Sequence, residues 1–160
     1  MVLDNILASK TVAFQDTNIP VPYSYRMYYR YAQIALIIGN CSSRNSVSWT
    51  KLQMISSALN YEAEYENLLM FLRNAKEHIP YIKFEPALKR AITFMQADGL
   101  IAFNTNVKIS LTEQGKKFLA ELIENTSIMI SDKEKINEIG KGLTESLVDG
   151  LVSSWRLYHV

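Results

Sequence analysis

The sequence has few of the residues from which enzyme and metal sites are usually built. Its 160 residues include one cysteine, two histidines and six glycines. Because Cys41 is the only cysteine, the chain has no intrachain disulfide, and no basic residue adjoins Cys41 in the sequence to activate its thiol. His78 and His159 lie far apart, without the spacing of a metal site, and the glycines form no phosphate loop. The composition therefore predicts a non-enzyme with no catalytic residues, cofactor, metal or small-molecule substrate.

The sequence also lacks charge of one sign and long apolar runs. Its 17 basic and 16 acidic residues give a net charge of +1, so bulk charge favours neither nucleic acid nor an anionic membrane. The longest apolar run, "IALIIG", is far too short to span a membrane. The opening "MVLDNILASK" lacks a signal pattern. We therefore expect a soluble cytoplasmic protein without a membrane partner.

Three segments are distinguished by their composition. Pro20 and Pro22 favour an extended path, which predicts an N-terminal arm over residues 1–22. Residues 23–125 contain the periodic apolar patterns of a folded domain. Residues 126–160 are predicted to be a C-terminal helical tail, with a capping box from Ser131 to Glu134.

Helical periodicity dominates the first half of the domain. A helix is predicted over 24–39, and its "AQIALII" portion is expected to be enclosed because it is apolar on nearly every side. A polar loop at 40–46 follows. Ser48 is placed to cap the next helix, and a further helix is predicted over 62–77.

The second half of the domain predicts a helix, a short hairpin and another helix. "IPYIKF" is a candidate strand, and Pro86 occupies the first position of a helix that ends at Gly99. "LIAF" and "VKISL" predict two strands around the tight turn "NTN", and Thr112 caps the following helix. The fold class is therefore predicted to be mainly α with a small β-hairpin: a winged-helix domain with an added C-terminal helical tail.

The stretch "YSYRMYYRY" contains five of the nine tyrosines in nine residues. Partly buried rings whose hydroxyls stay in contact with water account for two or three of these tyrosines. Stacking of nucleic-acid bases on the rings is a further alternative. Tyrosine and arginine together are typical of protein–protein anchors, and we interpret the cluster as a partner interface. The candidate residues are Tyr23, Tyr25, Arg26, Tyr28, Tyr29 and Arg30.

The tail offers a second candidate interface. Leu147, Leu151, Trp155 and Tyr158 follow roughly one stripe of the last helix, and Leu151, Trp155 and Tyr158 are the candidate partner contacts. The alternative is that this stripe folds back onto the core.

A nucleic-acid role is supported by fewer residues. The predicted helix 86–98 exposes Lys89, Arg90 and Thr93, which suit phosphate or base contacts, and Lys108 follows the turn. The turn itself has no cation, and only three or four phosphate contacts are available.

Four segments, "YAQIALII", "KLQMISSALN", "PALKRAITFMQADGLI" and "ISLTEQGKKF", resemble the small middle component of three-component ABC-ATPase systems. Bacterial Lamassu anti-phage defence operons are the nearest example. The resemblance covers about residues 25–120 and implies a non-catalytic winged-helix subunit. Its expected partners are an SMC-like coiled-coil ATPase, whose heads it would brace, and a nuclease effector, with DNA contacted through the complex. The alternative is a small dimeric winged-helix transcription regulator.

Overall fold

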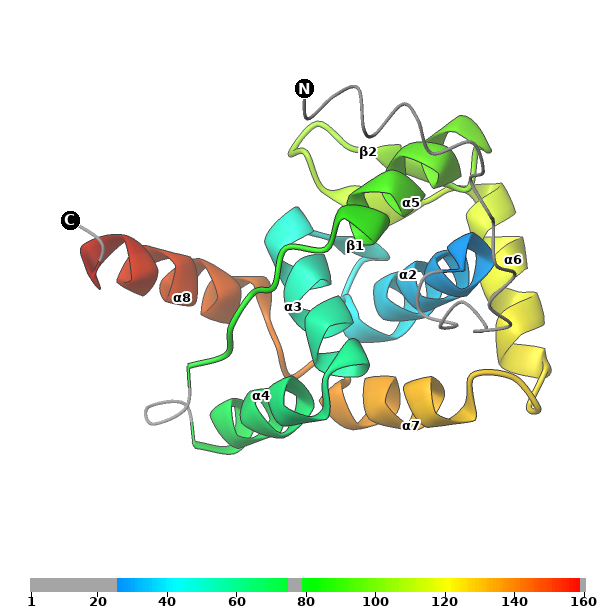
Figure 1. Cartoon of the computed structure of the whole chain (residues 1–160). Coiled ribbons are helices and arrows are strands. Elements are labelled where there is room, and N and C mark those ends of the chain that lie inside the picture. The colour runs from blue at the N-terminus through cyan, green and yellow to red at the C-terminus, as the bar shows by residue number, and fades with distance from the viewer. Residues whose placement is uncertain (1–25, 75–78, 159–160) are drawn as a thin grey trace, which may run out of the picture.

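The computed structural model describes residues 26–74 and 79–158 (Figure 1). Within these ranges the protein is mainly helical, with seven helices and a three-stranded antiparallel sheet. The helices are α2 (Met27–Cys41), α3 (Trp49–Asn60), α4 (Glu62–Asn74), α5 (Pro86–Ala97), α6 (Glu113–Glu124), α7 (Ile130–Ile139) and α8 (Glu145–Tyr158). The strands are β1 (Ser46–Val47), β2 (Ile101–Phe103) and β3 (Ile109–Leu111). The predicted arm, residues 1–22, lies outside the described ranges.

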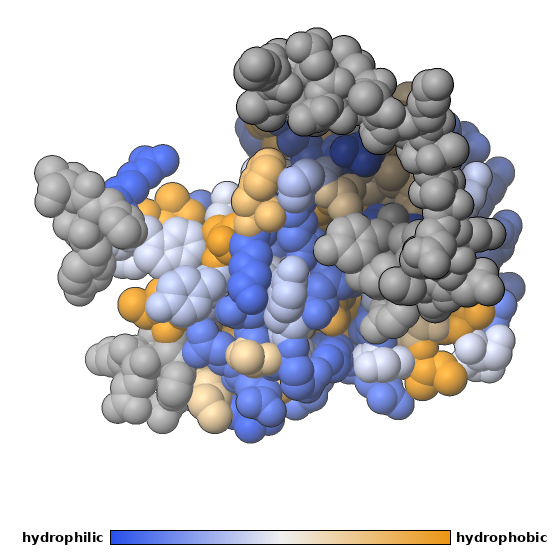
Figure 2. All heavy atoms as spheres, in the orientation of Figure 1, coloured by the Kyte–Doolittle hydropathy of each residue, from blue (hydrophilic) through white to orange (hydrophobic). Residues whose placement is uncertain are grey.

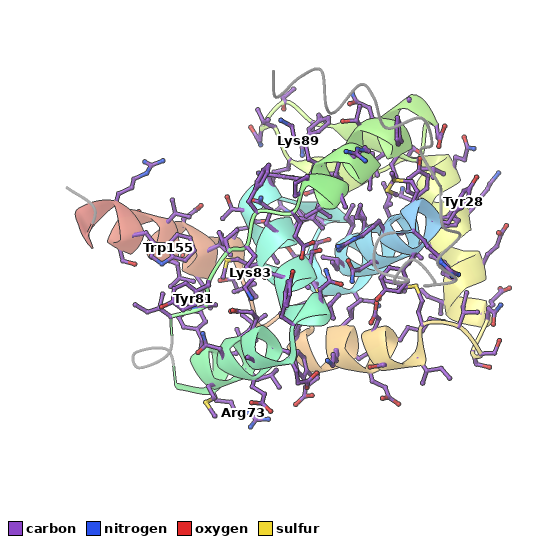
Figure 3. All side chains as sticks on the ribbon, viewed as in Figure 1. Tyr28, Arg73, Tyr81, Lys83, Lys89 and Trp155 are labelled. Atoms are coloured by element: carbon purple, nitrogen blue, oxygen red, sulfur yellow. The ribbon has the colours of Figure 1, made fainter. Side chains whose placement is uncertain are left out.

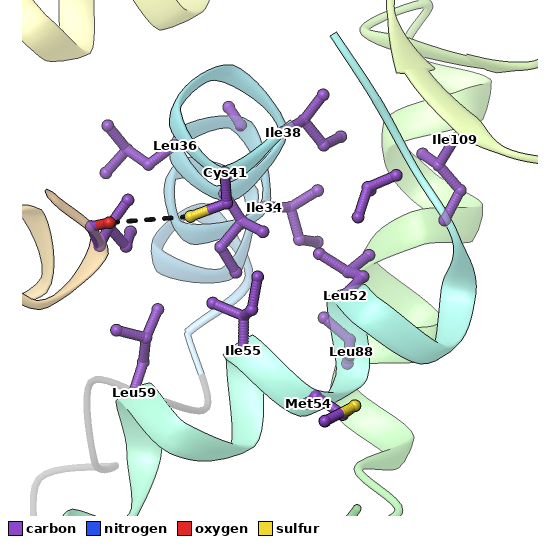
Figure 4. Close-up of a cluster of buried hydrophobic side chains, with 14 of the residues drawn as sticks. Ile34, Leu36, Ile38, Cys41, Leu52, Met54, Ile55, Leu59, Leu88 and Ile109 are labelled. Atoms are coloured by element: carbon purple, nitrogen blue, oxygen red, sulfur yellow. Dashed lines mark hydrogen bonds between the residues drawn. The ribbon is translucent and has the colours of Figure 1, made fainter. Parts of the chain in front are cut away.

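Helix α2 is the centre of the core. It packs against α3, α5, α6 and α7, and the side chains of Ile34 through Ile38 are fully buried. Figure 4 shows this cluster, in which α2 meets Leu52 and Ile55 of α3, Leu88 of α5 and Ile109 of β3. The prediction that the "AQIALII" portion is enclosed is confirmed. The neighbouring helices and β3 cover it on all sides and remove its apolar surface from water.

Local capping signals set several element boundaries as predicted. The Ser48 hydroxyl accepts a hydrogen bond from the amide of Lys51, and the Thr112 hydroxyl accepts one from Gly115. Pro86 is the first residue of α5, and Gly99, with a φ of +73°, follows its end.

The sheet has one strand more than the predicted hairpin. Its order is β1-β3-β2; Val47 pairs with Ile109 at one edge of β3 and Ile101 pairs with Leu111 at the other. The polar loop predicted at 40–46 did not include a strand. The two residues of β1 carry no strand pattern of their own, and only pairing with β3, far away in sequence, makes them a strand.

Two other local predictions were wrong. Residues 79–84, "IPYIKF", form no strand in the described structure; the segment has no strand beside it, and Ile79, Tyr81 and Phe84 are exposed. The capping box at Ser131 is absent, since α7 already begins at Ile130 without a side-chain cap.

The predicted tail is packed onto the domain. α7 lies against α2 and α3, and α8 lies against α3. Ile136, Ile139, Leu143 and Val148 are buried in the same cluster as the side chains of α2. In Figure 1, α8 extends from the body, beginning beside α3.

Candidate partner and nucleic-acid interfaces

The tyrosine cluster is divided between the surface and the interior. Tyr28 is 83% exposed, and its ring packs edge-to-face with the buried Tyr31 ring at a centroid distance of 5.9 Å. Arg26 is also exposed. Tyr23 and Tyr25 lie outside the described residues. Of the described candidates on this stretch, Arg26 and Tyr28 therefore have the exposure that a partner contact requires.

Arg30 is a correction to the predicted interface. Its side chain is 5% exposed, and Nη1 lies 2.9 Å from a carboxylate oxygen of Glu85, which is also buried. The same nitrogen donates to Gln33 and Ser56. A buried guanidinium needs such partners, so Arg30 joins α2 to α3 and to the start of α5 instead of facing a partner protein.

Tyr29 and Tyr31 use their hydroxyls within the protein. The Tyr29 hydroxyl donates to Asp132 of α7 at 2.5 Å, and the Tyr31 hydroxyl donates to Asp98 at 2.8 Å. Burial, followed by the bond to Asp98, raises the pKa of Tyr31 to about 12. Burial raises the pKa of Asp132 above its usual range, against the opposing effect of Tyr29. These two tyrosines therefore attach α2 to its neighbours.

The candidate contacts on α8 largely face the core. Leu151 is 7% exposed, which corrects its assignment to a partner surface, and Trp155 is partly buried against the core cluster. The side chain of Tyr158 lies outside the described part of the structure. Leu151 and Trp155 therefore follow the alternative considered from the sequence, in which the stripe folds back onto the core. Packing there removes their apolar surface from water.

The nucleic-acid candidates fall in two places. Lys89, Arg90 and Thr93 are exposed on α5, although the Thr93 hydroxyl donates to the carbonyl of Lys89. Lys108 is half-buried at the end of the β2–β3 turn, and its ammonium lies 3.9 Å from Glu145. Lys108 lines a pocket to which no residue of α5 contributes.

An exposed aromatic surface is formed by the segment between α4 and α5, where the sequence predicted only a strand, together with the C-cap residue of α3. We call Tyr61, Tyr81, Lys83 and Phe84 the aromatic surface. Tyr81 and Phe84 are each 69% exposed, and the Lys83 ammonium lies 3.8 Å from the centroid of the Tyr61 ring. In Figure 3, Tyr81 and Lys83 project on the same side of the molecule as Trp155, whereas Tyr28 lies at the opposite edge. The aromatic and apolar residues of "IPYIKF" were the available signal, and the segment was interpreted as a short strand.

A cleft of about 450 Å³ adjoins the aromatic surface. Tyr61 and Phe84 line it together with Arg90 and the buried pair Arg30 and Glu85. Figure 2 shows the hydrophobic side chains of this view gathered near α8 and the segment before α5, and again near the start of α7, with hydrophilic residues over α3 and α4. The cleft brings aromatic rings and one exposed arginine together on the surface, a composition typical of protein interfaces.

Within residues 26–74 and 79–158, no group of three or more His, Cys, Asp or Glu side chains is arranged to hold a metal ion. The buried Cys41 thiol donates to the carbonyl of Ile136, and burial raises the pKa of Cys41 to about 11 (Figure 4). In the same ranges, every helix is too short or too polar for a membrane crossing.

Comparison with known proteins assigns no relative. No protein-family model matches the chain, and no curated protein or solved structure matches it either.

Proposed function

We propose that this chain is a non-catalytic winged-helix subunit that assembles a larger protein complex. The order α2, β1, α3, α5, β2, β3 and the strand order β1-β3-β2 support the winged-helix assignment. That arrangement would make α5 the recognition helix, the β2–β3 turn the wing and α4 an insertion. The wing residues Asn104, Thr105 and Asn106 carry no charge.

The aromatic surface is the observation that carries the assembly role. The rings of Tyr81 and Phe84, each 69% exposed, are costly to leave in water. Aromatic side chains are enriched at the energetically dominant positions of protein interfaces. The neighbouring cation Lys83 and the cleft-lining Arg90 add polar groups that would orient a partner.

The more specific proposal names the complex. The resemblance of four segments to the Lamassu-type middle component supports a role in bacterial defence against phage or plasmid DNA. The partners would be an SMC-like ATPase and a nuclease effector, and DNA would be contacted mainly through the complex. The near-neutral net charge supports this role, because a subunit that binds DNA alone usually needs several phosphate contacts.

The test is affinity purification of the tagged chain from its host at near-physiological salt, with co-eluting proteins identified by mass spectrometry. We expect a large coiled-coil ATPase and a nuclease in the eluate of the wild type. The variant Tyr81→Ser/Phe84→Ser should lose at least one of them while keeping its helical circular dichroism. Tyr28→Ser removes a ring that is 83% exposed at the opposite edge, so it tests the other candidate contact separately. Recovery of the chain alone would contradict the assembly role.

Exposed Lys89 and Arg90 favour a second candidate, a dimeric DNA-binding regulator. Both side chains project from α5, the helix that a winged-helix protein would insert in the major groove. A regulator should bind duplex DNA tightly with a steep salt dependence, and Lys89→Ala and Arg90→Ala should weaken the binding. An assembly subunit should bind DNA weakly by itself, and the two substitutions should have little effect. A salt titration of duplex binding separates the two functions.

A further inference from the structure

A second pocket lies away from the aromatic surface, where the loop after α2 meets the β2–β3 turn and the segment between α7 and α8. Its volume is about 340 Å³, and four of its lining side chains are cations: Arg44, Lys51, Lys108 and Lys141. Glu145 is the one carboxylate in the lining. In a protein with a net charge of +1, this concentration of positive charge is local and sets the pocket apart.

Lys51 is the least ordinary of these cations because it is 3% exposed. Its ammonium donates to the carbonyl of Cys41 at 2.6 Å. Burial lowers the pKa of Lys51, while the charge of Glu145 opposes this effect. An ammonium is rarely buried without compensating charge, since removing it from water is costly.

Glu145 gives incomplete compensation. Its Oε1 accepts a hydrogen bond from the amide of Ser48 at the start of α3 and lies 3.9 Å from the Lys108 ammonium. Its Oε2 is buried and has no hydrogen-bond partner among the described residues. The pocket lining therefore has four cations and one carboxylate, which is a formal excess of positive charge.

We propose that this pocket binds a phosphate group. Lysine and arginine at the rim of a concave site provide charge-assisted hydrogen bonds to phosphate oxygens. The volume lies near the lower end for small-molecule sites, which suits a compact phosphate group. A small phosphorylated compound and the backbone of a nucleic acid both supply this chemistry. The inference does not depend on the assembly role.

The test uses the whole chain and two probes, inorganic pyrophosphate and a short DNA duplex of mixed sequence, by titration calorimetry at low and moderate salt. Arg44→Gln and Lys141→Gln each remove one charge from an exposed side chain and should weaken binding roughly fivefold or more. Glu145→Gln retains an oxygen acceptor for Ser48 but removes the opposing charge, so it should strengthen binding. Lys117→Gln, an exposed position on α6 outside the pocket lining, is the matched control.

The two probes separate the sources of phosphate. Pyrophosphate binding that follows the pattern of the variants indicates a small phosphorylated ligand. Duplex binding that follows the same pattern, without pyrophosphate binding, indicates a nucleic-acid backbone. The proposal is overturned if neither probe binds, or if Lys117→Gln weakens binding as much as the two pocket variants. Thermal unfolding of each variant verifies that the fold is retained.

Discussion

The guanidinium of Arg30 and the carboxylate of Glu85 lie 2.9 Å apart in the interior, where their side chains are 5% and 9% exposed. Ser56 and Asn60 of α3 donate to the same carboxylate, so a single ionic cluster joins α2, α3 and the start of α5. The pair holds the N-terminal end of α5 in place, which positions Phe84 and Arg90 at the surface on either side of it. Arg30, which the sequence predicted to contact a partner, thus supports from the interior the aromatic surface on which the partner is proposed to bind.

Arg30→Met should destabilise the fold by about 3–5 kcal/mol, because Glu85 would remain buried without its counter-charge. Urea unfolding measures this change. The double variant Arg30→Met/Glu85→Met should be more stable than Arg30→Met alone, since no charge is then left unpaired. Arg26→Met, at an exposed position on the same stretch, is the control and should change stability by less than about 0.5 kcal/mol. A loss for Arg30→Met as small as that control would contradict the role of the pair.

Asp132→Asn should change how stability depends on pH. Burial raises the pKa of Asp132 above its ordinary value of 3.8, so the folded protein holds this proton more tightly than the unfolded chain does. The stability that the protonated Asp132 carboxyl contributes to the folded state is fully present below pH 3.8. It is lost as the pH rises through the pKa of Asp132 in the folded protein. Asparagine remains neutral throughout. The stability of Asp132→Asn relative to wild type should therefore increase across this window, as measured by urea unfolding at successive pH values. An increase of wild-type stability over the variant across the same window would refute this assignment.

Gly115→Ala and Gly150→Ala should have opposite effects, although both glycines lie in helices. A Cβ at Gly115 would lie 2.0 Å from the carbonyl oxygen of Leu100, a backbone atom that cannot turn aside. We expect a loss of about 1–3 kcal/mol or more from this overlap. A Cβ at Gly150 would meet nothing within 4 Å, and alanine there should add about 0.5–1 kcal/mol of helix stability. Thermal unfolding of the two variants measures both, and equal shifts would argue against the close approach of α6 to Leu100.

Cys41 should be almost inert to alkylation while the protein is folded. Its side chain is fully buried, and burial raises the pKa of its thiol to about 11, so little thiolate is present near neutral pH. Iodoacetamide should modify it at least about 100-fold faster in denaturing urea than in buffer, a ratio that mass spectrometry of timed samples can determine. Comparable rates in the two conditions would place the thiol at the surface.

Signals that act within a few residues were predictable from the sequence. The caps at Ser48 and Thr112, the proline at the start of α5 and the glycine after its end each depend on the backbone groups of the adjacent turn. The enclosed portion of α2 was also predictable, because an apolar residue at nearly every position has no face suited to water. The arrangement of these elements as a winged helix, and the partners of the chain, stay proposals.

The sequence by itself therefore determined the helical character of the described chain, several of its element boundaries and the composition of its core helix. Only the tertiary structure decided which tyrosines are exposed, that Arg30 is paired with Glu85, that Ser46 and Val47 form a strand, and that residues 79–84 present aromatic rings instead of pairing. The physical reason is the distance over which each effect acts. Caps and periodicity involve neighbours along the chain, whereas burial, ion pairing and strand pairing depend on residues that become neighbours only when the chain folds.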